Sequence, residues 1–171
     1  MIKLAIADDE ALFRKGMRQL ISDFDEMDVV LEAGNGEELL EHLATADTSP
    51  DALLLDLKMP GLNGIETAKI LQADYSSIRV IVLSTFFSKA FIINMIELGA
   101  SAYLAKNSLP EEVEATIREV CTKGFSYNQK VMEVIRDNMI QKTKPRIKTP
   151  FGVELTRRER EILQLICEEY T

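Results

Sequence analysis

The chain has 171 residues, of which 46% are hydrophobic and 28% are charged, and its net charge is −8. This composition is that of an ordinary globular protein, and no hydrophobic run approaches the roughly 18 residues that a membrane span needs. The N-terminus lacks the features of a signal peptide, and Cys121 and Cys167 have no metal-ligand spacing. We therefore expect a cytoplasmic protein that does not associate with membranes.

The charge is unevenly distributed along the chain. Residues 1–125 carry 11 Lys and Arg against 21 Asp and Glu, whereas residues 126–155 carry 6 against 3. An acidic region repels the phosphates of nucleic acids and is suited to binding cations. The basic stretch 142–148 could approach DNA, although a solvated linker is the more common role of such a segment.

Short hydrophobic runs alternate with longer segments whose hydrophobic residues recur at helical spacing. Strands are predicted at residues 4–7, 29–31, 52–55, 80–83 and 102–104. Helices are predicted after them, at residues 11–21, 39–43, 65–71, 91–98 and 113–120. Nearly continuous Val, Ile, Leu and Ala in the runs is typical of strands that helices cover on both faces. The pattern therefore predicts a doubly wound α/β fold with a parallel sheet.

A different organisation follows residue 125. Hydrophobic residues at helical spacing over 131–140 predict one more helix, and the Pro- and Gly-containing stretch 141–154 is typical of an interdomain linker. Thr156 and Glu159 then have the spacing of a capping box, which predicts the start of a further helix.

Acidic residues come directly after two of the predicted strands: Asp8 and Asp9 after the first, and Asp56 after the third. If these strands are neighbours, their ends lie about 4.8 Å apart and the carboxylates converge. Two like charges at about 4 Å repel by about 4 kcal/mol at an effective dielectric of about 20, so this crowding calls for a cation, and Mg²⁺ suits such a site. Taken singly, Asp8 and Asp9 could cap the following helix, and Asp56 could be a turn residue.

Two more polar residues are predicted at the same edge of the sheet. Ser84 ends the fourth strand and Lys106 follows the fifth. A hydroxyl and an ammonium group are suited to binding phosphoryl oxygens. Each residue alone could be an ordinary capping serine or a solvated lysine, but together with the three aspartates they indicate a phosphate site.

These residues and their neighbours resemble the receiver domain of two-component response regulators. The matching motifs are Asp8-Asp9, the stretch 56–64 (DLKMPGLNG), Leu83-Ser84 and the stretch 103–106 (YLAK), so the resemblance covers residues 1 to 123. The stretch 155–163 (LTRREREIL) resembles the opening helix of the helix-turn-helix effector domain of NarL/LuxR-type regulators.

The resemblance implies a flavodoxin-like fold with strand order 2-1-3-4-5. It implies a regulatory protein, not an enzyme, which accepts a phosphoryl group from a histidine kinase on Asp56. It also assigns roles to the other residues: Mg²⁺ binding by Asp8, Asp9, Asp56 and the backbone carbonyl of Lys58, phosphoryl binding by Ser84 and Lys106, and a switch formed by Ser84 and Tyr103.

Three regions follow from these two resemblances. We expect a receiver domain at 1–123, a linker with a helix at 124–154, and the first helix of an incomplete helix-turn-helix domain at 155–171. We also expect a longer transcription factor that binds DNA only through its complete C-terminal domain, with homodimerisation as one option. A single-domain receiver without DNA-binding output is the alternative.

Two other functions fit the fold class less well. An aspartate-nucleophile phosphatase would need a second Asp two residues after Asp56, where Lys58 stands, and a flavin or dinucleotide binder would need a Gly-rich motif where the acidic residues 8–10 stand. The sequence also departs from many receivers at two positions. Asn107 replaces a proline, which leaves the conformation of its peptide bond open, and Thr85 replaces Ala or Gly, which could slow access to the phosphate.

Overall fold

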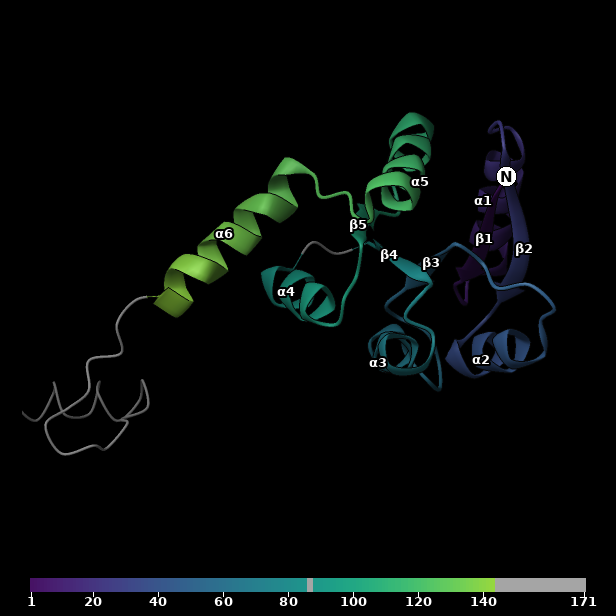
Figure 1. Cartoon of the computed structure of the whole chain (residues 1–171), viewed down its shortest axis with the longest axis horizontal. Coiled ribbons are helices and arrows are strands. Elements are labelled where there is room, and N and C mark those ends of the chain that lie inside the picture. Colours follow the sequence, from purple (N-terminus) through teal and green to yellow (C-terminus); the bar gives the residue numbers. More distant parts are fainter. Residues whose placement is uncertain (86–87, 144–171) are drawn as a thin grey trace, which may run out of the picture. The chain divides into compact units, whose positions relative to one another are not determined.

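The computed structural model describes residues 1–85 and 88–143, in which strands and helices alternate (Figure 1). The strands are β1 (Ile2–Ala7), β2 (Met27–Ala33), β3 (Ala52–Asp56), β4 (Arg79–Ser84) and β5 (Ala102–Ala105). The helices are α1 (Ala11–Ser22), α2 (Gly36–Thr45), α3 (Gly64–Asp74), α4 (Lys89–Glu97), α5 (Pro110–Lys123) and α6 (Gln129–Thr143). Every strand and helix predicted for this part of the chain is present.

The five strands form one parallel sheet in the order β2-β1-β3-β4-β5. The flavodoxin-like order that the sequence led us to expect is therefore confirmed. The chain moves from β1 outward to β2 and then returns to place β3 on the other side of β1. The direction of the strand order therefore reverses between β1 and β3. In open α/β sheets, ligands bind beside the carboxyl ends of the strands at such a reversal.

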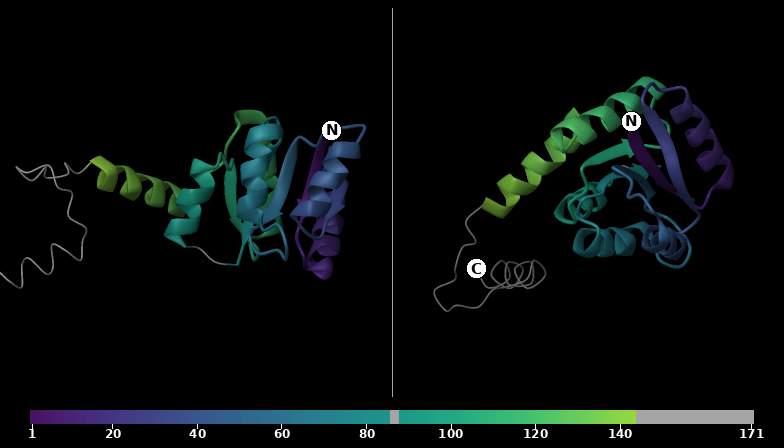
Figure 2. Two further views of the ribbon diagram at one scale, coloured as in Figure 1. Left: turned by 90° about the horizontal axis from the view of Figure 1, so that it is seen from below. Right: turned by 45° about the vertical axis from the view of Figure 1, so that its right-hand side comes forward.

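Helices cover both faces of the sheet (Figures 1 and 2). Buried side chains of α1 and α5 form one hydrophobic cluster with the sheet, and those of α2, α3 and α4 form another on the opposite face. Because β3 is covered on both faces, all five of its residues are buried, whereas β2 at the edge alternates between buried and exposed residues. Asp56, the last residue of β3, is therefore buried at the carboxyl end of the strand.

The start of α3 lies directly against the end of β3. Asn63 and Glu66 form a capping box that ends the loop and begins the helix. The first helical residue is Gly64, where a Cβ atom would collide with the carbonyl oxygen of Asp56 and would lie 2.7 Å from the Cα of Leu57. A residue without a side chain is therefore what allows α3 to begin beside the end of β3.

A short turn connects α5 to α6. Gly124 ends α5 in the left-handed conformation, with φ of 94°, and the side chain of Asn128 accepts a hydrogen bond from the backbone N–H of Val131 at the start of α6. Val131 and Val134 are buried in the cluster on the α4 side of the sheet. The first turns of this predicted helix therefore belong to the compact unit of residues Met1–Asn138.

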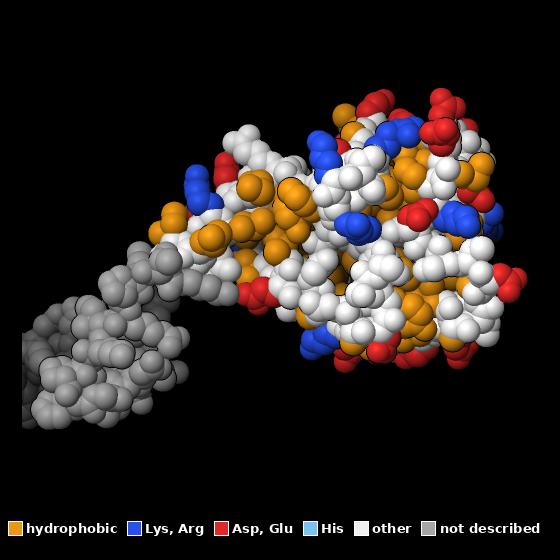
Figure 3. All heavy atoms as spheres, viewed as in Figure 1, with side chains coloured by type: hydrophobic (Ala, Val, Ile, Leu, Met, Phe, Trp, Pro, Cys, Tyr) orange, Lys and Arg blue, Asp and Glu red, His pale blue; other side chains and the backbone are white. Residues whose placement is uncertain are grey.

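The surface of the described part carries charged groups of both signs together with hydrophobic side chains on and near α6 (Figure 3). Phe125, which precedes α6, and Met132, which lies within it, are each more than half exposed. None of the described helices has the length and hydrophobicity that crossing a membrane requires. The helix expected within 155–171 lies outside the described residues, so the division into three regions stays a prediction.

Candidate functional site

Three carboxylates meet at the carboxyl ends of β1 and β3. These strands are neighbours, and one oxygen each from Asp8, Asp9 and Asp56 lies within 4.8 Å of the others. Asp8 and Asp56 are buried, whereas Asp9 is exposed. The convergence that the sequence pattern predicted is therefore present, with two of the three negative charges held away from water.

Lys106, which follows β5, places its ammonium group among these carboxylates. Its Nζ lies 2.7 Å from Asp8 Oδ2, 2.8 Å from Glu10 Oε1 and 2.9 Å from Asp56 Oδ2, and 4.8 Å from the centre of the Phe13 ring. Burial alone would lower the pKa of Lys106, but the contacts with the three carboxylates outweigh it and raise the pKa above its ordinary value. Lys106 therefore stays positively charged at any physiological pH.

Asp8 is fully buried, and its two oxygens have unequal partners. Oδ1 accepts a hydrogen bond from the backbone N–H of Glu10, at 2.9 Å. Oδ2 forms an ion pair with Lys106 at 2.7 Å, and within the described residues it has no further polar partner. Burial raises the pKa of Asp8, an effect that Lys106 and the Glu10 N–H oppose and that the charge of Asp56 reinforces.

The net charge of this cluster is negative. Asp8, Asp9, Glu10 and Asp56 provide four carboxylates against the single ammonium of Lys106. An excess of buried or partly buried negative charge is unfavourable unless protons or a cation balance it. Asp8 Oδ2, whose one partner among the described residues is Lys106, and donors that are all oxygens suit a hard divalent cation.

The loop between β3 and α3 is held from the side by α2. The backbone N–H of Gly36 donates to the carbonyl of Leu62 at 3.1 Å, and the N–H of Leu62 donates to Glu37 Oε1 at 2.8 Å. Closer to the site, the N–H of Lys58 lies 3.3 Å from Asp56 Oδ1. The loop that would offer the Lys58 carbonyl to a metal is thus fixed by hydrogen bonds at both ends.

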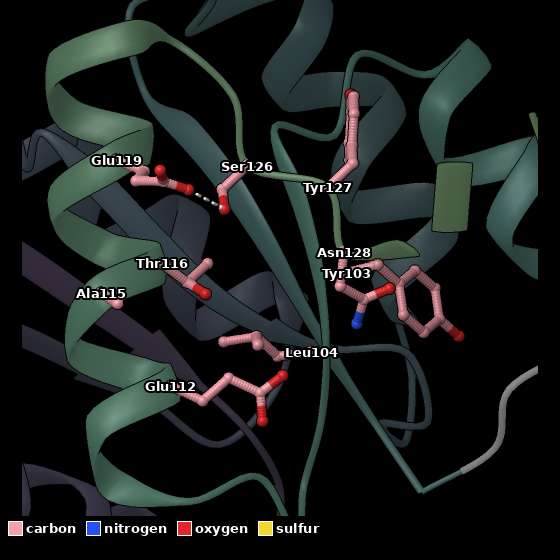
Figure 4. A pocket seen from close by; sticks show the side chains of 9 residues that line it. All are labelled: Tyr103, Leu104, Glu112, Ala115, Thr116, Glu119, Ser126, Tyr127 and Asn128. Carbon is pink, nitrogen blue, oxygen red and sulfur yellow. Dashed lines mark hydrogen bonds between the residues drawn. The ribbon is translucent and has the colours of Figure 1, made fainter. Parts of the chain in front are cut away.

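Ser84 and Tyr103 lie on the neighbouring strands β4 and β5, and both are buried. Burial raises the pKa of the Tyr103 hydroxyl, a hydrogen bond with the Ser84 side chain opposes this rise, and the charge of Asp56 adds to it. Tyr103 points to one side of β5 and Leu104 to the other, where a hollow of about 220 Å³ lies against α5 (Figure 4). The tyrosine hydroxyl is therefore linked to Ser84 rather than to solvent.

Comparison with known proteins identifies the family. The profile of the response regulator receiver domain matches residues 4–118. This chain is a response regulator receiver. It is 33% identical over 168 residues to the uncharacterized transcriptional regulatory protein YxjL of Bacillus subtilis, an alignment that covers 95% of this chain and 74% of YxjL.

Two further relatives place this receiver in the NarL/LuxR type. It is 33% identical over 166 residues to the nitrate/nitrite response regulator protein NarL of Escherichia coli, covering 96% of this chain and 74% of NarL. The crystal structure of a LuxR-family two-component response regulator from Aurantimonas sp. SI85-9A1 superposes with a TM-score of 0.70 at 28% identity, covering 81% of this chain and 97% of that one. Members of this family are phosphoacceptor regulatory proteins rather than enzymes.

Several features of the receiver's site were missed from the sequence. Glu10 and Phe13 both contact Lys106, although only the position of Glu10 next to Asp8 and Asp9 hinted at a place in the site. The peptide bond between Lys106 and Asn107, left open by the sequence, is trans.

Proposed function

We propose that this receiver accepts a phosphoryl group on Asp56 from the phosphohistidine of a cognate histidine kinase and thereby controls a DNA-binding output. The observation that carries the proposal is the meeting of Asp56 with Asp8, Asp9 and Lys106 at one edge of the sheet. The choice of Asp56 as the acceptor rests on the motif at 56–64, which resembles that of receivers.

The residues present supply the parts of such a transfer. A carboxylate oxygen of Asp56 attacks phosphorus while the bond from phosphorus to the donor's imidazole nitrogen breaks, and its electron pair stays on that nitrogen. The ammonium of Lys106, already 2.9 Å from Asp56 Oδ2, would stabilise negative charge on the phosphoryl oxygens. The hydroxyl of Ser84 would donate a hydrogen bond to one of these oxygens.

The site fits Mg²⁺. The side chains of Asp8, Asp9 and Asp56 and the backbone carbonyl of Lys58 would hold the ion, and the lack of a hydrogen-bond donor on the buried Oδ2 of Asp8 supports this assignment. All of these donors are oxygens, which Mg²⁺ prefers, and so few protein ligands would leave positions for water and phosphate. When bound, Mg²⁺ would neutralise charge on the transferring group.

Phosphorylation would add a charge of roughly −2 beside the hydrogen bond between Ser84 and Tyr103. As Ser84 turns toward the phosphoryl group, that hydrogen bond is exchanged and Tyr103 loses its present partner. The surface formed by α4, β4, β5 and α5 would then change between two states. Val131 of α6 shares a hydrophobic cluster with Tyr103, so α6 would respond as well.

The proposed output belongs to the complete protein. YxjL and NarL are named as regulators, and this chain spans 74% of the length of each. We propose a receiver at 1–123, a linker at 124–154 and, at 155–171, the first helix of a helix-turn-helix domain. Specific DNA binding would need the recognition helix of the complete domain, acting in a cytoplasmic protein that forms homodimers on paired half-sites.

The test is mass spectrometry of the chain after incubation with Mg²⁺ and acetyl phosphate, with a purified histidine kinase as a second donor. We expect a gain of about 80 Da, the mass of one phosphoryl group, in the wild type and none in Asp56→Asn. Asp47→Asn is the matched control, because Asp47 is an exposed aspartate outside the site, and it should gain the mass normally. A phosphoryl group that remains in Asp56→Asn would overturn the assignment of the acceptor.

A further inference from the structure

Glu10 forms a contact with Lys106 that the local structure of the chain does not require. It occupies the N-cap position of α1, where an Asp, Ser or Thr side chain would normally accept a hydrogen bond from the first turn of the helix. The Glu10 side chain makes no such bond. Instead its Oε1 accepts a hydrogen bond from Nζ of Lys106, 96 residues further along the chain, at 2.8 Å.

Three carboxylates surround the ammonium group of Lys106: it donates hydrogen bonds to Glu10 and Asp56, and it forms an ion pair with Asp8. An ammonium group has three donors and no more, and here Asp8, Glu10 and Asp56 each lie within 2.9 Å of Nζ. Because three carboxylate oxygens already crowd Nζ, an incoming phosphoryl oxygen competes with them for a close contact with Lys106.

Glu10 differs from the other two carboxylates in its exposure. Its side chain is 63% exposed, whereas that of Asp8 is fully buried and that of Asp56 is 7% exposed. Water can replace Lys106 as a partner of Glu10 at little cost, because exposed ion pairs are weak. Among the three partners of Lys106, Glu10 is thus the one whose contact is most readily exchanged.

Lys106 does not depend on Glu10 for its location. The Lys106 side chain is only 9% exposed, and its ammonium group also contacts Asp8, Asp56 and the face of the Phe13 ring. Loss of Glu10 would therefore leave Lys106 in the site, with one carboxylate fewer competing for its donors.

We propose that Glu10 is a positioning residue that restrains Lys106 in the unphosphorylated receiver, so that phosphoryl transfer to Asp56 includes breaking the bond between Glu10 and Lys106. This inference rests on the proposed function of Asp56 and Lys106. Glu10 acts on the reaction through Lys106 and sets how fast the receiver accepts a phosphoryl group.

The test is the second-order rate constant for phosphorylation by acetyl phosphate at saturating Mg²⁺, measured by mass spectrometry for the wild type, Glu10→Gln and Glu10→Asp. We expect both variants to react up to roughly three-fold faster, the scale set by an exposed ion pair. Glu10→Gln keeps an acceptor oxygen but only a weaker, uncharged hydrogen bond to Lys106. Glu10→Asp is decisive, because it keeps the negative charge but is one methylene too short to reach Lys106 in the same way.

Two controls separate the effect of the contact from effects of overall charge and of stability. Glu111→Gln removes one exposed negative charge from the first turn of α5, which follows Lys106, and should leave the rate constant unchanged. Aspartate is also a better N-cap than glutamate, so Glu10→Asp should unfold at an equal or higher temperature than the wild type while reacting faster. A merely structural role of Glu10 would not separate the rate from the stability in this way.

The outcomes distinguish this proposal from the proposed function. If the wild type takes no phosphoryl group, the proposed function fails, and this inference fails with it. If the wild type reacts, but both Glu10→Gln and Glu10→Asp react no faster than the wild type, only the proposed restraint by Glu10 is wrong. A faster Glu10→Gln beside an unchanged Glu10→Asp would also overturn it, because the effect would then come from charge and not from the contact.

Discussion

The close contact between Gly64 and the end of β3 leads to a sharp prediction for Gly64→Ala. The added Cβ would meet backbone atoms only, namely the carbonyl oxygen of Asp56 and the Cα of Leu57 at 2.7 Å, so no flexible side chain can move away. Either the start of α3 or the end of β3 must shift. Overpacking of this kind costs typically 1–3 kcal/mol, and we expect the upper end of this range, about 3 kcal/mol, because backbone must move.

The assay for Gly64→Ala is urea unfolding followed by circular dichroism, combined with the phosphorylation measurement. Gly16→Ala is the matched control. Gly16 lies inside α1, and a Cβ there would meet nothing within 4 Å. Alanine is favoured over glycine in helices by roughly 0.5–1 kcal/mol, so the control should be stabilised and remain phosphorylatable.

The two glycine substitutions should therefore change stability in opposite directions. Gly64→Ala should also slow phosphorylation under conditions in which the variant is still folded, because the collision is with the backbone of Asp56 itself. An unfolding free energy of Gly64→Ala within 0.5 kcal/mol of the wild type, with normal phosphorylation, would refute the reasoning from the close contact.

Three further predictions concern other parts of the structure. Burial raises the pKa of Asp8 from its ordinary value of 3.8, so without Mg²⁺ the wild type should lose stability as the pH rises from about 4 through the raised pKa. Asp8→Asn should lack this loss, unfold at a higher temperature than the wild type at pH 7 and gain less from added Mg²⁺, and a lower unfolding temperature would contradict this account. Glu37→Ala removes the acceptor of the Leu62 N–H and should weaken Mg²⁺ binding a few-fold, as measured by calorimetry. Glu37→Gln keeps an acceptor and should bind Mg²⁺ nearly as the wild type does. Equal affinities of the two variants would show that this hydrogen bond does not hold the loop between β3 and α3 in place for metal binding. Val131→Ala creates a cavity under α6 and should lower the unfolding free energy by roughly 1–3 kcal/mol, compared with less than about 0.5 kcal/mol for the exposed Met132→Ala, and two equal effects would mean that α6 is not docked as described.

Much of the fold is encoded in local sequence patterns. The runs at 52–55 and 80–83 are hydrophobic without alternation because both faces of β3 and β4 are covered, and this made the strands and their parallel arrangement predictable. The same rule placed Asp8 and Asp56 at one edge of the sheet, since the residue after a parallel strand lies at its carboxyl end.

The contacts within the site were harder to predict. The reach of Glu10 to Lys106 depends on side-chain torsions and on the separation of β1 and β5, which the sequence pattern does not encode. Tyr103 shares a hydrophobic cluster with Val131 and Val134 of α6, and this joining of β5 to α6 was not predicted from the sequence. A helix at 131–140 was predicted from its spacing, but which surface it would cover could not be read from its own residues.

The packing of α6 against the receiver limits how this helix can take part in signalling. Val131 and Val134 are nearly or fully buried, and hydrating a valine side chain costs roughly 1.5–3 kcal/mol. Lifting both out of the cluster would thus cost about 3–6 kcal/mol, so at most about one molecule in a hundred would have α6 detached at any moment. Under the proposed function, a signal that reaches this helix would therefore have to move it by a small tilt or slide that keeps both valines buried.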